Sequence, residues 1–364
     1  MDFAFSDEQQ MLRDSARSFL SSKFPAERVA ELADSDDGWD RGSWSDMAEL
    51  GWIGLSVSEN DGGAGFGFIE EAVVFEELGR ALYPGPYFAT VGLALPALVG
   101  ADALGRTVSG EATATFAWAE PTGPQRLTDL EGMSTKAEPD NETWKLTGEK
   151  ALVADAAAAD LAVVAASAAE GIGLFLVDLS DAHVTSASTM DPTRRMGRIV
   201  FDGTPATQLV APGESAEAIA RIRLRALAAL ALEAVGVAQT ALDLAKEHVK
   251  ERKQFDKPIG AYQAVSHQVA DTYVELELAR SLAYWAAWCV SESDDQAPVA
   301  VAAAKSAAAE AAVWACERSI QVHGGIGFTW EHPLHRYYKR AQWIDSFEGF
   351  GSQHRKQVAQ EILG

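Results

Sequence analysis

The stretch from Ala216 to about Arg252 constrains the fold of this 364-residue chain most, because it is typical of one long helix. It contains no proline and is rich in alanine, leucine and arginine, which are strong helix formers. Three more helical stretches are expected at Tyr262–Glu292, Pro298–Val322 and Leu334–Ile344. Four helices of these lengths predict a helical bundle.

The first part of the chain is also expected to be mainly helical. Ser6 and Gln9 have the spacing of a capping box that opens a helix, and a short helix is expected over Trp44–Leu50. A stronger helix is expected over Ile69–Ala81, with its carboxylates facing away from its apolar residues. These patterns predict an N-terminal helical domain over residues 1–111.

Between residues 112 and 215 the pattern changes to short apolar runs bounded by glycine, proline, aspartate or asparagine, which is typical of strands. No long helix intervenes, so an antiparallel sheet or small barrel is favoured over a parallel, doubly wound sheet. The predicted fold class is therefore α+β, with an N-terminal helical domain, a middle antiparallel β domain over 112–215 and a C-terminal four-helix bundle over 216–364. The strand-like runs are Ala114–Trp118, Thr143–Leu146, Leu161–Val164, Leu174–Val177 and Ile199–Phe201.

The charge of the chain argues against two classes of partner. A net charge of −23 and an isoelectric point near 4.6 would repel nucleic acids and anionic membranes, so neither is expected as a partner. The N-terminal residues lack the basic and apolar regions of a signal peptide, and no run approaches 18 uninterrupted apolar residues. A cytoplasmic protein is expected.

Cysteine and histidine usage indicates no metal or disulfide chemistry. Cys289 and Cys316 lie in alanine-rich helical segments without C-x-x-C spacing, so two reduced and mostly buried thiols are expected. The pair His332 and His335 is interrupted by a proline and has no third ligand at helical spacing. No metal site is predicted.

The corner after the long helix carries Arg252, Gln254 and Phe255, and Pro258 forces a turn before the next helix. An arginine there can donate a planar fork of hydrogen bonds to a pyrophosphate. Phe255 offers a flat surface to an adenine or flavin ring. The same residues are also typical of a solvated helix end beside a core aromatic.

A glycine-dense turn, Gln321 to Gly327, follows the third helix of the predicted bundle and includes Gly324 and Gly325. Glycine has no Cβ, so the main chain of such a turn can approach a bulky ligand closely. A glycine cluster after a helix is also typical of a Schellman-type helix stop.

Glu348 lies between Phe347 and Gly349 on an otherwise apolar stretch, where Trp343 and Phe350 can help to exclude water. Desolvation raises the pKa of a buried carboxylate and makes it a better base. Glu348 is therefore expected to be a carboxylate that is shielded from water. The alternative is a solvated glutamate near a helix end.

Together these motifs resemble the flavin-dependent acyl-CoA dehydrogenase family. The match extends from Arg252 through Pro258 and Ile259 to Gln263, and helix, sheet, helix is also the family's order of domains. The resemblance implies Glu348 as the base that removes the α-proton of an acyl-CoA thioester, FAD as the hydride acceptor, and a separate electron-transfer carrier protein. The residues it implies for FAD binding across a subunit interface are Arg252, Gln254, Phe255, Tyr262, Gln263, Gln321, His323, Gly324 and Gly325.

The chain departs from the family pattern mostly where the family faces the flavin ring. Thr122–Arg126 replaces the usual glycine-rich continuation after Glu120-Pro, and Leu152–Ala154 replaces Trp-Ile-Thr or Trp-Ile-Ser. Phe350 stands where the family has threonine, and Asp256 stands where it usually has glycine. Alanine at position 154 cannot donate the side-chain hydrogen bond that the family makes near the ring.

These losses resemble a subset of actinobacterial family members that act in steroid side-chain degradation. In them, two unlike subunits form an α2β2 heterotetramer, and only one subunit holds the ring and the base. The leading hypothesis is FAD-dependent α,β-dehydrogenation of an acyl-CoA by a homo- or hetero-tetramer, a dimer of dimers, in fatty acid or steroid catabolism. The alternatives are a non-catalytic subunit that completes the FAD site of an unlike partner, and an oxygen-using acyl-CoA oxidase.

Overall fold

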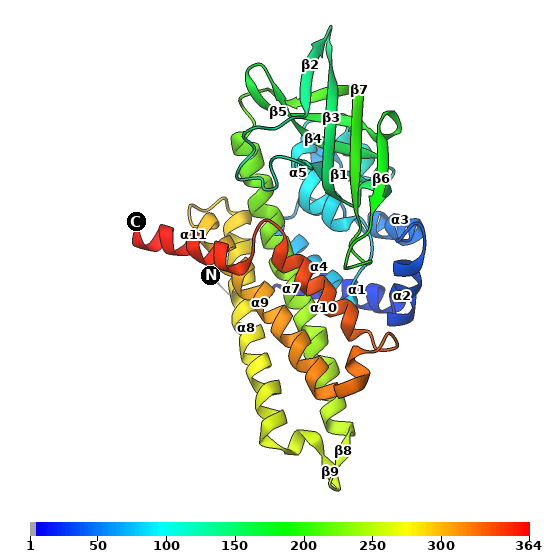
Figure 1. Cartoon of the computed structure of the whole chain (residues 1–364), viewed down its shortest axis with the longest axis vertical. Coiled ribbons are helices and arrows are strands. Elements are labelled where there is room, and N and C mark those ends of the chain that lie inside the picture. The colour runs from blue at the N-terminus through cyan, green and yellow to red at the C-terminus, as the bar shows by residue number, and fades with distance from the viewer. Residues whose placement is uncertain (1–4) are drawn as a thin grey trace. The chain divides into compact units, whose positions relative to one another are not determined.

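The computed structural model describes residues 5–364 (Figure 1). The chain forms two compact units. One contains the residues up to Ala30, together with Phe68–Tyr83 and Leu227–Gly364, and the other contains Glu31–Gly67 and Pro84–Ala226. The domain boundaries at 111/112 and 215/216 stay predictions.

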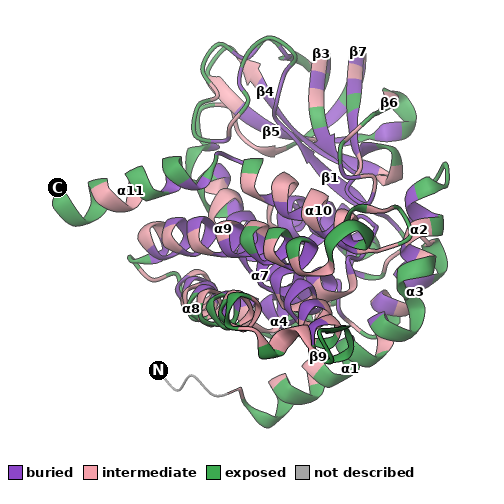
Figure 2. Ribbon diagram, turned by 60° about the horizontal axis from the view of Figure 1, so that its bottom comes forward, coloured by how far each residue is buried: buried purple, intermediate pink, exposed green. Residues whose placement is uncertain are grey.

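The four long helices expected in the last part of the chain are present. They are α7 (Ala216–Glu251), α8 (Gln263–Ser291), α9 (Ala297–His323) and α10 (Leu334–Ser346), and a further helix, α11 (Gly351–Leu363), was not expected. Figure 2 shows α7 as buried along most of its length, which explains its run of alanine and leucine. Its small and apolar side chains are enclosed by the neighbouring helices.

Two helices from the first part of the chain belong to the same unit as most of this bundle. In α1 (Asp7–Lys23), the Ser6 hydroxyl accepts a hydrogen bond from the backbone of Gln9, and the Gln9 side chain accepts one from the backbone of Ser6. The predicted capping box is therefore confirmed. The helix expected over Ile69–Ala81 is α4 (Phe68–Ala81).

The carboxylates of α4 were expected to face away from its apolar residues, but three of them are buried as well. Glu71, Glu76 and Glu77 are all buried. Arg17 donates to both oxygens of Glu77, and Arg280 on α8 lies 3.2 Å from Glu76. Buried carboxylates need such partners because an unpaired buried charge is very costly. The cations come from distant parts of the sequence, so the periodicity of α4 alone misplaced these residues.

The helices of the other unit are short. The helix expected over Trp44–Leu50 begins earlier, because Asp40 caps it by accepting a hydrogen bond from the backbone of Gly42. These helices are α3 (Arg41–Glu49), the π-helix Phe88–Ala94, α5 (Leu95–Leu98) and α6 (Ala103–Val108), while α2 (Ala26–Asp34) crosses between the two units.

Seven strands make the sheet of this unit. All five expected runs lie in strands apart from Trp118, which follows β1. Four of the strands, β3, β4, β5 and β7, are much longer than expected, and β2 and β6 were missed. The strands are β1 (Ala114–Ala117), β2 (Lys136–Asp140), β3 (Thr143–Ala154), β4 (Leu161–Ala168), β5 (Gly171–Asp178), β6 (His183–Ala187) and β7 (Met196–Val210).

The strand pairings close into a ring, as in a small barrel. Strand β4 pairs with β5, β5 with β7, β7 with β3, β3 with β2, and β2 with β4, while β1 and β6 add to β4 and β7. Most pairs are antiparallel, but β1 and β2 run parallel to β4. The α+β class, with helical, β and helical parts in that order, is confirmed.

Buried residues explain the remaining composition. Both cysteines are buried and free, as expected. Within residues 5–364, two helical segments, Ala216–Glu251 and Ala297–Phe328, are long and apolar enough on average to span a bilayer, although neither is an uninterrupted apolar run. Most of each apolar window, 78% and 67%, is buried inside the fold, so packing accounts for its composition.

Candidate functional site

A two-residue hairpin turn forms the corner after α7. Strands β8 (Lys253–Gln254) and β9 (Lys257–Pro258) pair antiparallel, and the backbone N–H of Ile259 donates to the Arg252 carbonyl at 2.8 Å. Phe255 and Asp256 at the tip both have positive φ, +52° and +63°. Asp256 thus adopts the conformation that glycine favours, which aspartate tolerates better than most residues.

The turn presents Phe255 to the outside, with 85% of its surface exposed. This arrangement has two costs. The apolar ring remains in water, and the left-handed backbone is strained for a residue with a Cβ. Tyr262, at the start of α8, holds the hairpin from inside by donating from its hydroxyl to the Gln254 carbonyl at 3.1 Å. The corner is therefore built to project an aromatic ring.

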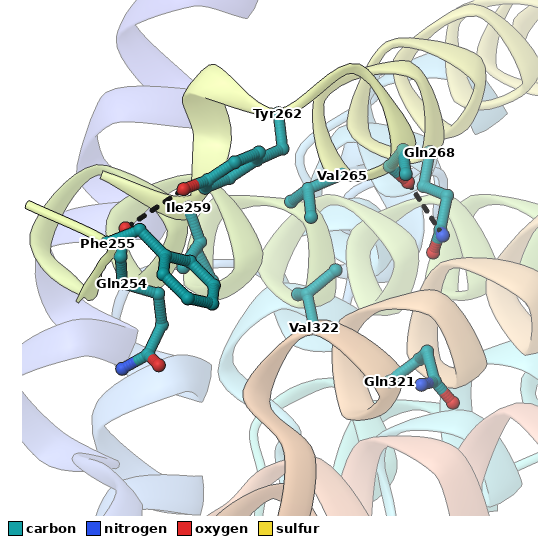
Figure 3. A pocket seen from close by; sticks show the side chains of 9 residues that line it. Gln254, Phe255, Ile259, Tyr262, Val265, Gln268, Gln321 and Val322 are labelled. Atoms are coloured by element: carbon teal, nitrogen blue, oxygen red, sulfur yellow. Dashed lines mark hydrogen bonds between the residues drawn. The ribbon is translucent and has the colours of Figure 1, made fainter. Parts of the chain in front are cut away.

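A pocket of about 370 Å³ lies beside this hairpin (Figure 3). Val265 on α8 and Val322 on α9 point toward one another across it, and Gln268 lines it from α8. Its walls are mainly apolar, with amide groups among them. The lining residues are Gln254, Phe255, Ile259, Tyr262, Ala264, Val265, Gln268, Gln321 and Val322.

The structure brings four of the predicted site residues to this pocket, namely Gln254, Phe255, Tyr262 and Gln321. Their neighbours Arg252, Gln263, His323, Gly324 and Gly325 lie on the same segments without lining it, and their roles stay predictions. Sequence reasoning missed Ile259, Ala264, Val265, Gln268 and Val322 as lining residues. Ala264, Val265 and Gln268 share the spacing of one face of α8, but an apolar helical position is usually core.

The turn after α9 confirms the predicted helix stop, while its role toward a ligand stays a prediction. The Gly324 N–H donates to the carbonyls of Ile320 and Gln321, with φ of +67°, so the turn stops the helix. A Cβ added at Gly324 or Gly325 would meet no other atom within 4 Å. The main chain is therefore open to a ligand as well.

Next to this turn, three imidazoles form what we call the histidine stack, made of His248, His323 and His332. The rings of His248 and His323 are stacked with centroids 4.2 Å apart, and the His323 and His332 rings are 4.6 Å apart. Nδ1 of His323 lies 2.8 Å from the Ser319 carbonyl. His323 is thus engaged mainly with other protein groups.

Glu348 lies after the last turn of α10 and is buried, with 7% of its surface exposed. Its φ is +56°, a left-handed conformation that is rare for glutamate. Trp343 and Phe347 pack together with ring centroids 5.3 Å apart, and Phe347 is buried. Phe350 is 53% exposed, so more than half of this aromatic side chain faces solvent. The expectation of a carboxylate shielded from water is met at Glu348.

The residues expected to face the flavin ring lie on β3, in the other unit. Leu152 has φ of +53° and is 53% exposed, whereas Ala154 is buried. The alanine methyl group offers no hydrogen bond, so any polar contact at this end must come from the backbone.

Three family models together match nearly the whole chain. Models of the N-terminal, middle and C-terminal domains of acyl-CoA dehydrogenases match residues 6–103, 115–204 and 224–363. The acyl-CoA dehydrogenase IpdE2 of Mycobacterium tuberculosis is 34% identical over 337 residues, covering 92% of this chain and 91% of that protein. The chain belongs to the acyl-CoA dehydrogenase family.

Solved structures of acyl-CoA dehydrogenase relatives share the fold. The ChsE4-ChsE5 complex from Mycobacterium tuberculosis contains a chain that is 27% identical, with a TM-score of 0.89 and coverage of 100% of this chain and 99% of that one. An FAD-dependent dehydrogenase is 26% identical, with a TM-score of 0.86 over 100% of this chain and 99% of that chain. A steroid acyl-CoA dehydrogenase made of Tcur3481 and Tcur3483 also contains a chain of the same fold, with 30% identity and a TM-score of 0.85. The predicted resemblance to two-subunit steroid enzymes is therefore confirmed.

As a member of this family, the chain is an FAD-dependent oxidoreductase, or part of one, that acts on the CH–CH group of acyl-CoA thioesters. The pocket at the α7–α8 corner fits the adenylate half of FAD in its chemistry. It offers apolar walls to the base and amide groups to the edges of the base. Arg252, exposed on the segment that leads into the hairpin, carries the charge that a phosphate contact needs.

Proposed function

We propose that this chain is a catalytic subunit that performs α,β-dehydrogenation of an acyl-CoA thioester, with Glu348 as the base. The observation that carries the proposal is the burial of Glu348 on a left-handed backbone. Strained backbone at a buried ionisable residue is typical of a functional site, because packing must hold it there at a cost of about 1–3 kcal/mol. A carboxylate shielded from water is a stronger base than a solvated one.

In this proposal Glu348 takes the α-proton of the thioester onto a carboxylate oxygen. When bound, FAD would supply the acceptor for the hydride that leaves the β-carbon. Phe347, which precedes Glu348, and the Trp343 ring packed against it would help to restrict the access of water to the carboxylate. Exchange of the reducing equivalents with a separate electron carrier protein is part of the proposal.

The adenylate half of FAD is assigned to the corner after α7. Arg252 would pair with the pyrophosphate, Phe255 would stack on a ring, and Gln321 would bond to the edge of a base or ribose. The exposed main chain at Gly324 and Gly325 completes this side. Gln254, Tyr262, Gln263 and His323 support the same corner. An aromatic residue as exposed as Phe255 favours a site that closes only against a second subunit.

We further propose a tetramer, a dimer of dimers, located in the cytoplasm. The solved relatives include a complex of two named components, ChsE4 and ChsE5, which supports an assembly with an unlike partner. A tetramer of identical chains is the alternative. The acyl group is a fatty acid or a sterol side chain. Turnover with a graded panel of acyl-CoA thioesters would identify it.

A second candidate is a non-catalytic subunit that completes the FAD site of an unlike partner. Ala154 and the exposed Leu152 favour it, because neither supplies the polar or aromatic side chain that the family places against the ring. Phe350 in place of threonine has the same consequence. In this case Glu348 would be buried for structural reasons alone.

The experiment is to purify the native assembly, count FAD per chain and measure acyl-CoA-dependent bleaching of the flavin absorbance. Glu348→Gln should abolish bleaching while FAD content stays normal, because only the proton acceptor is lost. Glu361→Gln, on the exposed surface of α11, serves as the matched control and should bleach normally. Bleaching that survives in Glu348→Gln would establish the non-catalytic candidate, as would one FAD for every two chains with the base on the partner.

A further inference from the structure

A fully buried ion pair lies inside the β unit and takes no part in the proposed chemistry. The Nζ atom of Lys150 on β3 lies 2.9 Å from Oε1 of Glu120 and donates to the Trp118 carbonyl at 3.1 Å. Both side chains are 0% exposed. Burying two charges costs several kcal/mol for each ion before their attraction offsets it. Such a pair is therefore weak evidence for stability and needs another explanation.

Glu120 ties a third segment to this pair. Its Oε2 atom accepts from the backbone N–H of Ser134 at 2.7 Å and from the Ser134 hydroxyl at 2.6 Å. Its Oε1 atom accepts from the backbone N–H of Thr135 at 2.8 Å. The end of β1, the segment leading into β2 and the middle of β3 thus all meet at one carboxylate. Its hydrogen-bonding capacity is well used, as a buried carboxylate requires.

Just beyond Lys150, β3 loses its regular pairing. The register with β7 shifts between Lys150 and Val153, and Leu152 sits in the bulge with φ of +53° and an exposed side chain. The backbone N–H of Ala151 donates to the Ala119 carbonyl at 2.9 Å, so the bulge is attached to the end of β1 as well. Bulges of this kind re-aim side chains and are common beside active sites.

We propose that Glu120 and Lys150 are positioning residues that clamp the end of β1 to β3 and thereby fix the Leu152 bulge where it receives the flavin ring. The inference rests on the proposed function, which assigns Leu152–Ala154 to the ring. Since Ala154 provides no hydrogen bond through its side chain, backbone placement carries the whole of that contact. A buried ionic clamp sets backbone position more sharply than an apolar contact, because its geometry is directional.

The electrostatics of the pair give the clamp a pH dependence. Burial lowers the pKa of Lys150 to about 8, although the hydrogen bond and charge of Glu120 act in the opposite direction. Burial alone would raise the pKa of Glu120, but hydrogen bonds from Ser134, Thr135 and Lys150 outweigh it and lower that pKa to about 2. Glu120 is the charged group that acts on Lys150. The neighbouring Glu149 is paired with Arg198. As pH rises through about 8, Lys150 loses its proton and the ion pair is lost.

The test measures amide hydrogen-exchange protection of residues 151–155 in the purified chain at pH 7 and pH 9, corrected for intrinsic exchange. Lys150→Met should lower protection at pH 7 by about tenfold or more, which corresponds to a loss of about 1.4 kcal/mol of local opening free energy. Wild type at pH 9 should lose protection in the same segment, and Lys150→Met should show no further loss on going from pH 7 to pH 9. Lys145 lies on the same strand as Lys150 and forms an exposed ion pair with Asp140 on β2. Lys145→Met, which removes that pair, should match wild type.

Two outcomes would overturn the proposal. One is equal protection in wild type and Lys150→Met, and the other is a pH 9 loss that persists in Lys150→Met. If Lys150→Met does not fold, two other measurements test the proposal. They are the protection of residues 151–155 in Glu120→Gln, which keeps the shape of the side chain, and the comparison of wild type at pH 7 and pH 9.

A second measurement links the clamp to the flavin. The dissociation constant of FAD from the native assembly should rise about tenfold in Lys150→Met and stay unchanged in Lys145→Met. Lost protection with unchanged FAD affinity would overturn the link to the ring. Failure of the proposed function itself would be distinct, since it would appear as absent bleaching in wild type, whatever the protection of the bulge.

Discussion

The imidazole rings of His248 and His323 stack face to face, 4.2 Å apart and tilted by 27°, although 75 positions separate them in the sequence. The His332 ring, just before α10, packs against His323 at an angle of 55°. Burial, helped by the nearby His323 and Arg252, lowers the pKa of His248. Burial, helped by His323 and His248, lowers the pKa of His332. Protonation of His248 and His332 is therefore less favourable in the folded chain than in the unfolded chain.

The first prediction is a loss of stability in acid that originates in this stack. Because both pKa values are lowered on folding, the unfolded chain binds more protons, and the free energy of unfolding should fall as pH drops below about 6.5. Above that pH the contribution is fully present. Denaturant unfolding of wild type and His248→Phe between pH 7.5 and pH 5 measures it, and the variant should show a shallower decline. His183→Phe, at an exposed position on β6, should decline as wild type does.

The second prediction concerns the crossing of α4 and α7. A Cβ at Gly79 would lie 2.1 Å from the Glu233 carbonyl oxygen, and one at Gly236 would lie 2.0 Å from that of Glu76. Gly79→Ala and Gly236→Ala should each destabilise the protein by about 1–3 kcal/mol or more, because two backbones must move apart. Gly105 in α6 has no atom within 4 Å of an added Cβ. Gly105→Ala should therefore be stabilising by about 0.4–1 kcal/mol. Thermal denaturation of the three variants checks this order.

The third prediction concerns the buried ion pair of Glu233 and Arg340, which are both nearly inaccessible to solvent. Arg340→Met should reduce the free energy of unfolding by about 3–5 kcal/mol, because it leaves a carboxylate buried without its cation. The double variant Glu233→Gln/Arg340→Met should recover part of that loss in urea denaturation. Lys250→Met breaks the exposed pair with Glu247 and should cost at most about 1 kcal/mol. Equal losses in the buried and exposed variants would refute the argument.

The fourth prediction concerns the exposed arginine at the end of α7. Arg252→Ala should release FAD from the native assembly, raising its dissociation constant by about tenfold to a hundredfold for the loss of one charge-assisted phosphate contact. Lys253→Ala, one position along and also exposed, is the matched control and should retain FAD. Equilibrium dialysis with FAD gives both values. Normal retention in Arg252→Ala would remove this residue from the site.

Much of the fold was predictable where the signal is local. Alanine-rich stretches without an interior proline set the limits of α7, α8 and α9 to within a few residues, and the pair Ser6 and Gln9 set the start of α1. The strands were harder. Strand β2 contains Pro139, and only one residue of β6 is even partly buried, so neither has the apolar alternation by which a strand is recognised.

Site residues, too, could be predicted only where the sequence signal is local. Gln254, Phe255, Tyr262 and Gln321 could be found because they lie in short motifs with fixed spacing. Val265 and Val322 could not, since a valine on a helix has the same pattern whether it lines a pocket or the core. Glu76 and Glu77 were misplaced for a related reason, because their partners Arg280 and Arg17 lie far away in the chain.

The sequence by itself determined the order of helical and β segments, the family and hence the cofactor, because these depend on composition and spacing within short stretches. Only the tertiary structure decided which charges are buried together. It paired Lys150 with Glu120 and Arg340 with Glu233, and it closed the strands into a ring. The physical reason is that desolvation and pairing of charges depend on neighbours in space, and those neighbours come from segments tens to hundreds of residues apart.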